Sequence, residues 1–204
     1  MTAKRRIVLI GPPAAGKSRS GRRLAREIGA SYADTDRLIQ ASHGPIPDIF
    51  RDRGEAGFRE IERDTVARAL NDHDVISLGG GAIMDPGTQR IITEADAFVV
   101  YLTVRPDAVA ERIDNDKRPL ISGVESWQKL VSTRKATYER FASVTVDTSF
   151  RPMRRVVTEI ITALTQDGVI DESQTPAQRP PRLCTRTREV RAYSTSQEES
   201  DDHQ

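Results

Sequence analysis

The chain has 204 residues, with 31 Lys or Arg and 30 Asp or Glu, so its formal net charge is +1. This balance argues against a basic nucleic-acid-binding surface and against electrostatic attachment to a membrane. Cys184 is the only cysteine, which excludes an internal disulfide and fits a reducing compartment. No apolar run approaches the ~20 residues of a membrane span. We therefore expect a cytoplasmic protein that binds neither nucleic acid nor membranes.

Segments with strand and helix patterns alternate along the chain. Short β-branched runs predict strands, and apolar residues at helical spacing predict helices. In chain order we expect a strand over 7–10, a helix over 18–28, a strand over 31–33, helices over 37–42, 48–53 and 55–70, a strand over 75–78, a helix from about 86 to 93, a strand over 97–102, helices over 106–113 and 126–140, a strand over 144–146 and a helix over 152–164. Five strands joined by helices predict a three-layer α/β/α domain with a parallel sheet.

The composition changes near the C-terminus. Residues 169–204 are rich in Gln, Ser, Thr and charged residues, with basic side chains first and acidic ones last. The segment has too little apolar surface for its burial to offset the conformational entropy that is lost on ordering. We expect a folded domain over 1–168 and a disordered tail over 169–204, which is either a solvated extension or a weak interaction segment.

The first expected strand leads into the sequence Gly-Pro-Pro-Ala-Ala-Gly-Lys-Ser, residues 11–18. This sequence fits the Walker A pattern, and the strand before it and the helix after it are the context that pattern requires. Backbone amides and the helix N-terminus would hold the phosphates of a nucleoside triphosphate, and the hydroxyl of Ser18 is suited to Mg²⁺. A chance match is the alternative. The expected ATP contacts here are Gly11, Ala14, Ala15, Gly16, Lys17, Ser18 and Arg19.

Further polar and glycine-rich segments follow the later expected strands. Asp34 and Asp36 follow the second strand, and the glycines of 79–81 follow the third. The carboxyl ends of parallel strands share one edge of a sheet, so these residues belong beside Lys17. Carboxylates there can support Mg²⁺ and bind a substrate hydroxyl, and arginines match a substrate carboxylate. The set predicts a small acceptor that carries a hydroxyl and an anionic group.

Taken together, these segments resemble the shikimate kinases, of the nucleoside monophosphate kinase-like P-loop superfamily. The resemblance runs from about residue 5 to 164 and rests on G-P-P-A-A-G-K-S (11–18), D-T-D (34–36), D-I-F (48–50), F-R-x-I-E (58–62), S-L-G-G-G-A (77–82), R-P-L (118–120) and R-K-A-T-Y (134–138). It implies a five-stranded sheet in the order 2-3-1-4-5 and a lid over about 113–124. It also implies ATP- and Mg²⁺-dependent phosphorylation of the 3-hydroxyl of shikimate, on the way to chorismate and the aromatic amino acids.

The resemblance also assigns roles to residues. Lys17 and Arg118 would neutralise the transferring phosphate, Ser18 would bind Mg²⁺, and Asp34 would support the metal through water. Asp36 would bind the attacking hydroxyl, as a base or only as an orienting group. The remaining implied contacts are Arg59, Arg134 and the Gly80 amide for shikimate, and Arg112, Arg118 and Pro152 for ATP. We expect a monomer.

Several alternatives stay open at this point. A related kinase of a small sugar acid, such as gluconate, shares the Walker loop and Mg²⁺, and a nucleotide-binding regulator without chemistry shares the fold. Asp34 or Asp36 can be a helix N-cap only, and Arg59 can pair with Glu55 or Glu62 on a solvated helix face. The lid also departs from the family pattern, because Asp114 and Asp116 lie close to Arg118 in the sequence.

Overall fold

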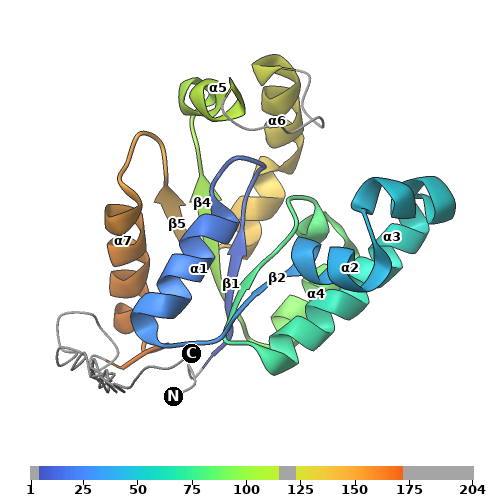
Figure 1. The fold of residues 1–204 in the computed structure, drawn as a ribbon. Helices are drawn as coiled ribbons and strands as arrows, with labels where there is room; N and C mark the ends of the chain where they lie inside the picture. Colours follow the sequence, from blue (N-terminus) through green and yellow to red (C-terminus); the bar gives the residue numbers. More distant parts are fainter. Residues whose placement is uncertain (1–4, 115–122, 172–204) are drawn as a thin grey trace, which may run out of the picture.

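A central parallel sheet is flanked by helices on both faces in the computed structural model, which describes residues 5–114 and 123–171, with residues 112–114 as backbone only (Figure 1). Its five strands are β1 (Ile7–Ile10), β2 (Tyr32–Asp34), β3 (Val75–Ser77), β4 (Phe98–Thr103) and β5 (Val144–Asp147). Every pairing is parallel, and the order is β2-β3-β1-β4-β5. The expected fold class and strand order are confirmed.

The helices lie close to the expected positions. They are α1 (Lys17–Ile28), α2 (Thr35–His43), α3 (Ile46–Asp72), α4 (Pro86–Glu94), α5 (Pro106–Asp114), α6 (Val124–Phe141) and α7 (Met153–Gln166). The two helices expected over 48–53 and 55–70 form the two arms of α3, which meet at Gly54, where φ is 66° and ψ is −176°. A short 3₁₀ helix, η1 (Ala82–Met84), was not expected.

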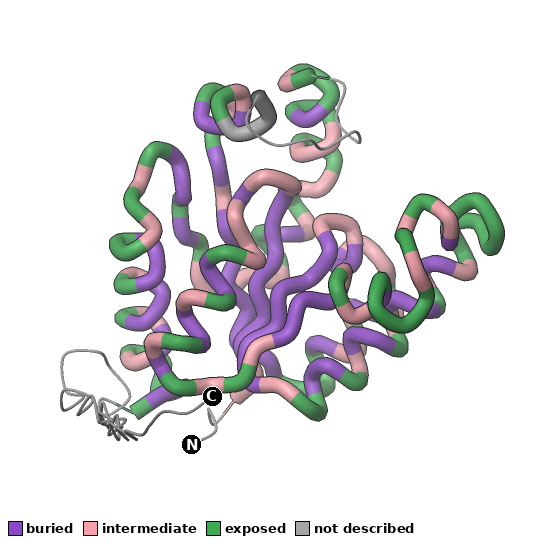
Figure 2. Tube along the Cα trace, viewed as in Figure 1, coloured by how far each residue is buried: buried purple, intermediate pink, exposed green. Residues whose placement is uncertain are grey.

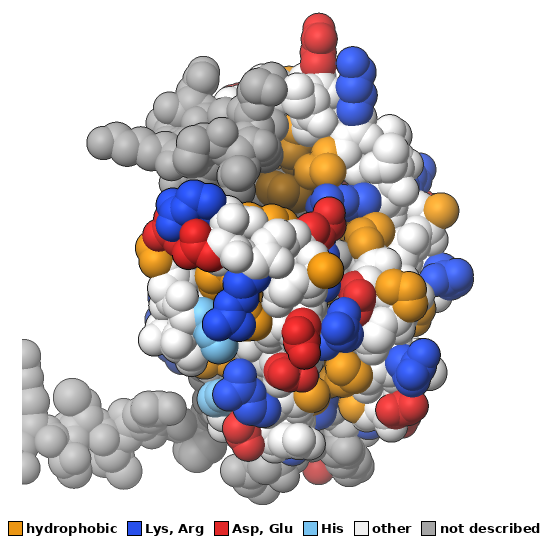
Figure 3. Space-filling model, turned by 90° about the vertical axis from the view of Figure 1, so that its right-hand side faces the viewer, with side chains coloured by type: hydrophobic (Ala, Val, Ile, Leu, Met, Phe, Trp, Pro, Cys, Tyr) orange, Lys and Arg blue, Asp and Glu red, His pale blue; other side chains and the backbone are white. Residues whose placement is uncertain are grey.

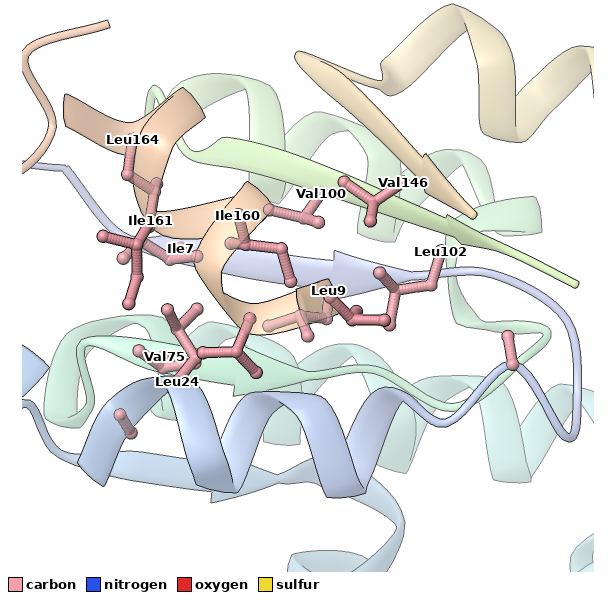
Figure 4. Packing of buried hydrophobic residues seen from close by; sticks show 14 of the residues in the cluster. Ile7, Leu9, Leu24, Val75, Val100, Leu102, Val146, Ile160, Ile161 and Leu164 are labelled. Atoms are coloured by element: carbon pink, nitrogen blue, oxygen red, sulfur yellow. The ribbon is translucent and has the colours of Figure 1, made fainter. Parts of the chain in front are cut away.

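Successive residues of the central strand β1 point to opposite faces of the sheet, as the period of two requires. Ile7 and Leu9 belong to a cluster with α1 and α7, whereas Val8 and Ile10 belong to a second cluster with α3 and α4. Figure 4 shows the first cluster, and Figure 2 shows that the three central strands β3, β1 and β4 are buried along nearly all of their length. Because both faces of these central strands are covered, β1 and most of β3 and β4 are continuous apolar runs.

Strand register aligns the carboxyl ends of β1, β2 and β3. Ser77 lies opposite Leu9 on one side and Asp34 on the other. The loops that follow these three strands therefore leave the sheet at the same edge. This places the Walker loop, the Asp34–Asp36 segment and the 79–81 glycines next to one another.

The surface over α2 and α3 is mixed in charge. In the side view of Figure 3, basic and acidic side chains are interspersed over this face. Within the ranges 5–114 and 123–171, none of the helices is long and apolar enough to cross a membrane.

The packed chain continues past residue 168, the expected end of the domain. Gly168 adopts φ 66°, and the Val169 amide donates to the Leu164 carbonyl at 2.9 Å, which closes the end of α7. Val169 and Ile170 are 0% and 1% exposed and join the α1–α7 core cluster. These two residues were assigned to the tail on composition, yet they belong to the core. Residues 172–204 lie outside the described part of the chain.

Candidate active site

The Walker loop has a backbone shape that depends on glycine. Gly11 has φ 138°, and a Cβ there would lie 2.3 Å from the Leu102 carbonyl oxygen, so a side chain does not fit. Gly16 has φ 83° and precedes α1. The Lys17 ammonium donates to the carbonyls of Gly11 and Pro12 at 2.9 and 3.1 Å. The loop thus encloses the lysine, and the N-terminus of α1 points into the same space, where an anion is favoured.

Ala14 completes the loop in a less usual way. Its φ of 64° lies in the left-handed region, which an alanine seldom occupies. The chain adopts that conformation although the side chain disfavours it. We take this strain as a sign that the loop shape is held by its surroundings.

Asp34 lies between α2 and the Walker loop. Its Oδ1 accepts the Arg37 amide at 3.3 Å, so it caps α2. Its Oδ2 is 3.5 Å from the Tyr32 hydroxyl, which also lies 3.2 Å from the Ser18 carbonyl oxygen. Asp34 is therefore an N-cap and, through Tyr32, a neighbour of Ser18.

Two carboxylates converge on Gly79. A Cβ at Gly79 would lie 2.5 Å from Asp36 Oδ1 and 3.0 Å from Glu62 Oε1. The Gly79 amide donates to the Thr35 hydroxyl at 3.1 Å, which fixes the turn against the start of α2. Asp36 therefore lies on the glycine turn, as expected.

Arg59 reaches the same turn from α3. One of its nitrogens would lie 2.9 Å from a Cβ at Gly81. The guanidinium pairs with the Glu62 carboxylate and lies 3.5 Å from that of Glu55. Burial raises the pKa of Glu62, the charge of Arg59 opposes this, and the negative charge of Asp36 adds to it. The pairing that the sequence left open is present, but Glu62 is only 1% exposed, so this is not a solvated helix face.

Gly80 lies at the centre of the turn. Its carbonyl accepts the Tyr138 hydroxyl at 2.5 Å and an Arg134 nitrogen at 3.2 Å. A Cβ at Gly80 would lie 3.4 Å from Pro13 Cδ in the Walker loop. The structure therefore brings together the four residues that were expected to bind the substrate: Asp36, Arg59, Gly80 and Arg134.

The other expected ATP contacts are less closely joined to this centre. Arg19 is exposed on α1, and Pro152 is the N-cap residue of α7. The segment before Pro152 contacts the Walker loop, because the Thr148 hydroxyl lies 3.2 Å from the Ala15 carbonyl oxygen. Arg118, most of the lid and the side chain of Arg112 lie outside the described residues.

Sequence reasoning missed three residues of the site. The sequence presents Glu62 as the last residue of the F-R-x-I-E motif and as a possible surface partner of Arg59, and its spacing of three from Arg59 was a usable signal. Tyr138 was noted only as part of a motif. Trp127 belongs to none of the motifs, yet its Nε1 donates to the Pro13 carbonyl at 2.9 Å. Nothing local in the sequence indicates a contact across 114 positions.

Comparison with known proteins identifies the family. A family model described as shikimate kinase matches residues 13–165. A shikimate kinase from Corynebacterium efficiens is 39% identical over 165 residues, which cover 79% of this chain and 97% of that protein. One from Mycobacterium avium is 41% identical over 165 residues, which cover 78% and 93%.

Solved structures agree with this assignment. A shikimate kinase from Acinetobacter baumannii in complex with shikimate superposes with a TM-score of 0.73 at 28% identity, covering 80% of this chain and 94% of that one. A gluconokinase from Sinorhizobium meliloti 1021 superposes with a TM-score of 0.59 at 17% identity, covering 82% and 95%, and so shares the fold alone. The chain therefore belongs to the shikimate kinase family.

Proposed function

We propose that the protein transfers the γ-phosphoryl group of ATP to the 3-hydroxyl of shikimate, giving shikimate 3-phosphate and ADP for chorismate and aromatic amino acid biosynthesis. One observation carries the proposal beyond family membership. A carboxylate (Asp36) and a guanidinium (Arg59) meet at one glycine turn, and that turn packs on Pro13 of the Walker loop. A hydroxy acid held at the turn would therefore lie next to a nucleotide held in the loop.

On the nucleotide side, the residues supply charge and direction. Lys17 would exchange its loop carbonyls for β- and γ-phosphate oxygens, which gain charge as the phosphoryl group moves. The backbone N–H groups of residues 14–18 would hold the remaining oxygens, since Pro12 and Pro13 have no N–H to donate. Contacts from Arg19, Arg112, Arg118 and Pro152 remain part of the proposal, with Arg118 reaching the transferring group from the lid.

On the acceptor side, Arg59 and Arg134 would bind the carboxylate of shikimate, because a guanidinium matches a carboxylate with two parallel hydrogen bonds. The buried Glu62 carboxylate pairs with the Arg59 guanidinium and so holds it beside Gly81 of the turn. Asp36 would accept the hydrogen bond of the attacking hydroxyl. That oxygen forms the new bond to the γ-phosphorus, the bond to the β,γ-bridging oxygen breaks, and the hydroxyl proton passes to Asp36 or solvent.

The oxygen ligands near the loop fit one Mg²⁺ ion that arrives with ATP. Within the described ranges, no cluster of three or more His, Cys, Asp or Glu side chains is placed to hold a metal. Mg²⁺ does not need such a cluster, because it keeps several waters and binds phosphates. We propose Ser18 as a direct ligand and Asp34 as a ligand through water, supported by their common neighbour Tyr32. When bound, the ion neutralises phosphate charge.

The proposal includes a monomer that acts on small molecules in the cytoplasm. The single cysteine fits a reducing compartment, and the balanced charge argues against a nucleic-acid or membrane partner. The proposal includes no nucleic-acid or membrane partner.

The test is ADP release from Mg·ATP with shikimate, with gluconate and with neither acid. We expect release that depends on shikimate alone and is nearly abolished in Lys17→Ala. Equal stimulation by gluconate would reassign the acceptor. ATP binding without turnover on any acid would favour the nucleotide-binding regulator.

A further inference from the structure

One helix contacts both binding loops of the site. From α6, Trp127 donates its Nε1 to the Pro13 carbonyl of the Walker loop at 2.9 Å. Eleven residues later on the same helix, Tyr138 donates its hydroxyl to the Gly80 carbonyl at 2.5 Å. Gly80 belongs to the glycine turn over 79–81, which is called the acceptor turn below because it would bind the molecule that accepts the phosphate. At 1.5 Å per residue, the backbone positions of Trp127 and Tyr138 lie about 16 Å apart along the helix axis, and the two side chains reach loops that are in contact with each other. One helix thus contacts both loops at the carboxyl edge of the sheet.

Both anchoring side chains are set in the core. Trp127 is 2% exposed and belongs to the cluster on the α1–α7 face, whereas Tyr138 is 0% exposed and belongs to the cluster on the α3–α4 face. The Tyr138 ring also stacks on Tyr101 of β4, with ring centres 5.1 Å apart. Rings held in this way have little freedom, so each polar atom presents a fixed donor to its loop.

The two loops also touch each other. The Pro13 ring lies against Gly80, with Cδ 3.4 Å and Cγ 3.5 Å from the position of a Cβ there. The helix, the Walker loop and the acceptor turn therefore form a closed set of three contacts. Because a peptide group is planar, fixing the Gly80 carbonyl also fixes the direction of the Gly81 amide, beside Arg59.

We propose that α6 is a two-point brace in which Trp127 positions the Walker loop and Tyr138 positions the acceptor turn. The brace holds each loop in the shape that receives its own ligand, so each contact supports the binding of that ligand. Both are positioning residues, since each acts through a backbone carbonyl. The inference rests on the proposed function for the identity of the acceptor.

The test is a crossed comparison of Trp127→Phe, Tyr138→Phe and Tyr101→Phe. Tyr101 is the matched control, because it is a buried tyrosine that stacks on Tyr138. The hydrogen bond to the Gly80 carbonyl comes from Tyr138 and not from Tyr101. The loss of one buried hydrogen bond should raise the KM for the ligand of that loop roughly fivefold to tenfold. Tyr138→Phe should raise the KM for shikimate and leave that for ATP within about twofold, and Trp127→Phe should do the reverse. Tyr101→Phe should move neither.

A structural role alone would not produce this crossed pattern. Lower melting temperatures with both KM values unchanged would overturn the proposal, as would equal increases of both KM values in either variant. If Trp127→Phe does not fold, the chain's only tryptophan can be replaced by benzothienylalanine, which keeps the ring shape and lacks the N–H. That protein should show the same rise in the KM for ATP, and a normal value would overturn the Walker-loop half.

Direct titration separates this inference from the proposed function. If the unaltered enzyme binds ADP but shikimate does not stimulate it, the proposed function fails. In that case, weaker ADP binding by Trp127→Phe still supports the Walker-loop half, and unchanged binding overturns it.

Discussion

Gly79→Ala tests whether the position of the Asp36 carboxylate controls the chemistry. The new Cβ would lie 2.5 Å from Asp36 Oδ1, whereas ordinary contact begins at 3.4 Å, so the carboxylate has to move by about 0.9 Å. Glu62 Oε1, at 3.0 Å, has less room to yield because it is buried and paired with Arg59. The displacement therefore falls on Asp36.

The same geometry predicts a large effect on rate and a small one on stability. A misplacement of ~1 Å at a reacting centre costs on the order of 100-fold in rate, which is about 2.7 kcal/mol of barrier. The free energy of unfolding should change by no more than about 1 kcal/mol. Gly79 does not have a positive φ, so alanine fits the backbone, and the atom that yields is the end of a side chain.

The assay is steady-state ADP release with shikimate, together with thermal unfolding of each protein. Gly80→Ala is the matched control, because its Cβ would meet Pro13 Cδ at 3.4 Å, which is ordinary contact, and we expect a change in kcat of less than about threefold. If Gly79→Ala kept kcat within threefold of the unaltered enzyme, the assignment of Asp36 to the reacting hydroxyl would be refuted. Equal losses in the two variants would show that the turn as a whole, and not Asp36, is sensitive.

Three further predictions follow from the packing and the charges. Arg59→Lys keeps the charge beside Glu62 but loses the planar fork, so the KM for shikimate should rise tenfold, roughly, with the KM for ATP nearly unchanged; similar rises in both would argue against a carboxylate contact. Truncation after residue 168 removes buried Val169 and Ile170, whereas truncation after residue 171 keeps them, so calorimetry should find the shorter chain less stable by about 3 kcal/mol; equal melting temperatures would contradict that packing. Burial, with the nearby Tyr138, raises the pKa of Tyr101 to about 12 against 10.0 in the unfolded chain. As the pH rises, Tyr101 therefore loses its proton in the unfolded state first, so its contribution to the free energy of unfolding is full below pH 10 and declines toward pH 12. Tyr101→Phe should flatten this decline when the free energy of unfolding is measured by urea titration at each pH. An unchanged dependence on pH would show that Tyr101 does not cause the decline.

The sequence by itself determined the local structure and the nucleotide loop. The apolar runs of the central strands, two shorter strand segments and the helices between them were sufficient for the α/β/α class, because burial of a central strand on both faces leaves a continuous apolar pattern. The Walker loop could be recognised from the sequence because its phosphate-binding residues are adjacent, with the glycines, Lys17 and Ser18 within eight positions. The acceptor residues Asp36, Arg59, Gly80 and Arg134 were named from motifs, and the parallel register explains why they meet.

Local composition did not predict burial where a residue is buried by segments that are distant in the sequence. Val169 and Ile170 follow a glycine at the end of a helix and precede a polar segment, so composition placed them in the tail. Their burial depends on packing against the side chains of α1, α7 and the sheet, which come together only in the folded domain. Likewise, the spacing of Glu62 from Arg59 predicts a pair but does not reveal that the pair is buried.

Only the tertiary structure decided how the two binding loops are held together. The contacts of Trp127 with Pro13 and of Tyr138 with Gly80 join positions 114 and 58 residues apart. Hydrophobic periodicity reports which face of α6 is buried, but it does not specify which backbone carbonyl a buried ring donor will meet. That choice follows from the parallel register and from where α6 crosses the sheet edge, and it is set only when the whole domain packs.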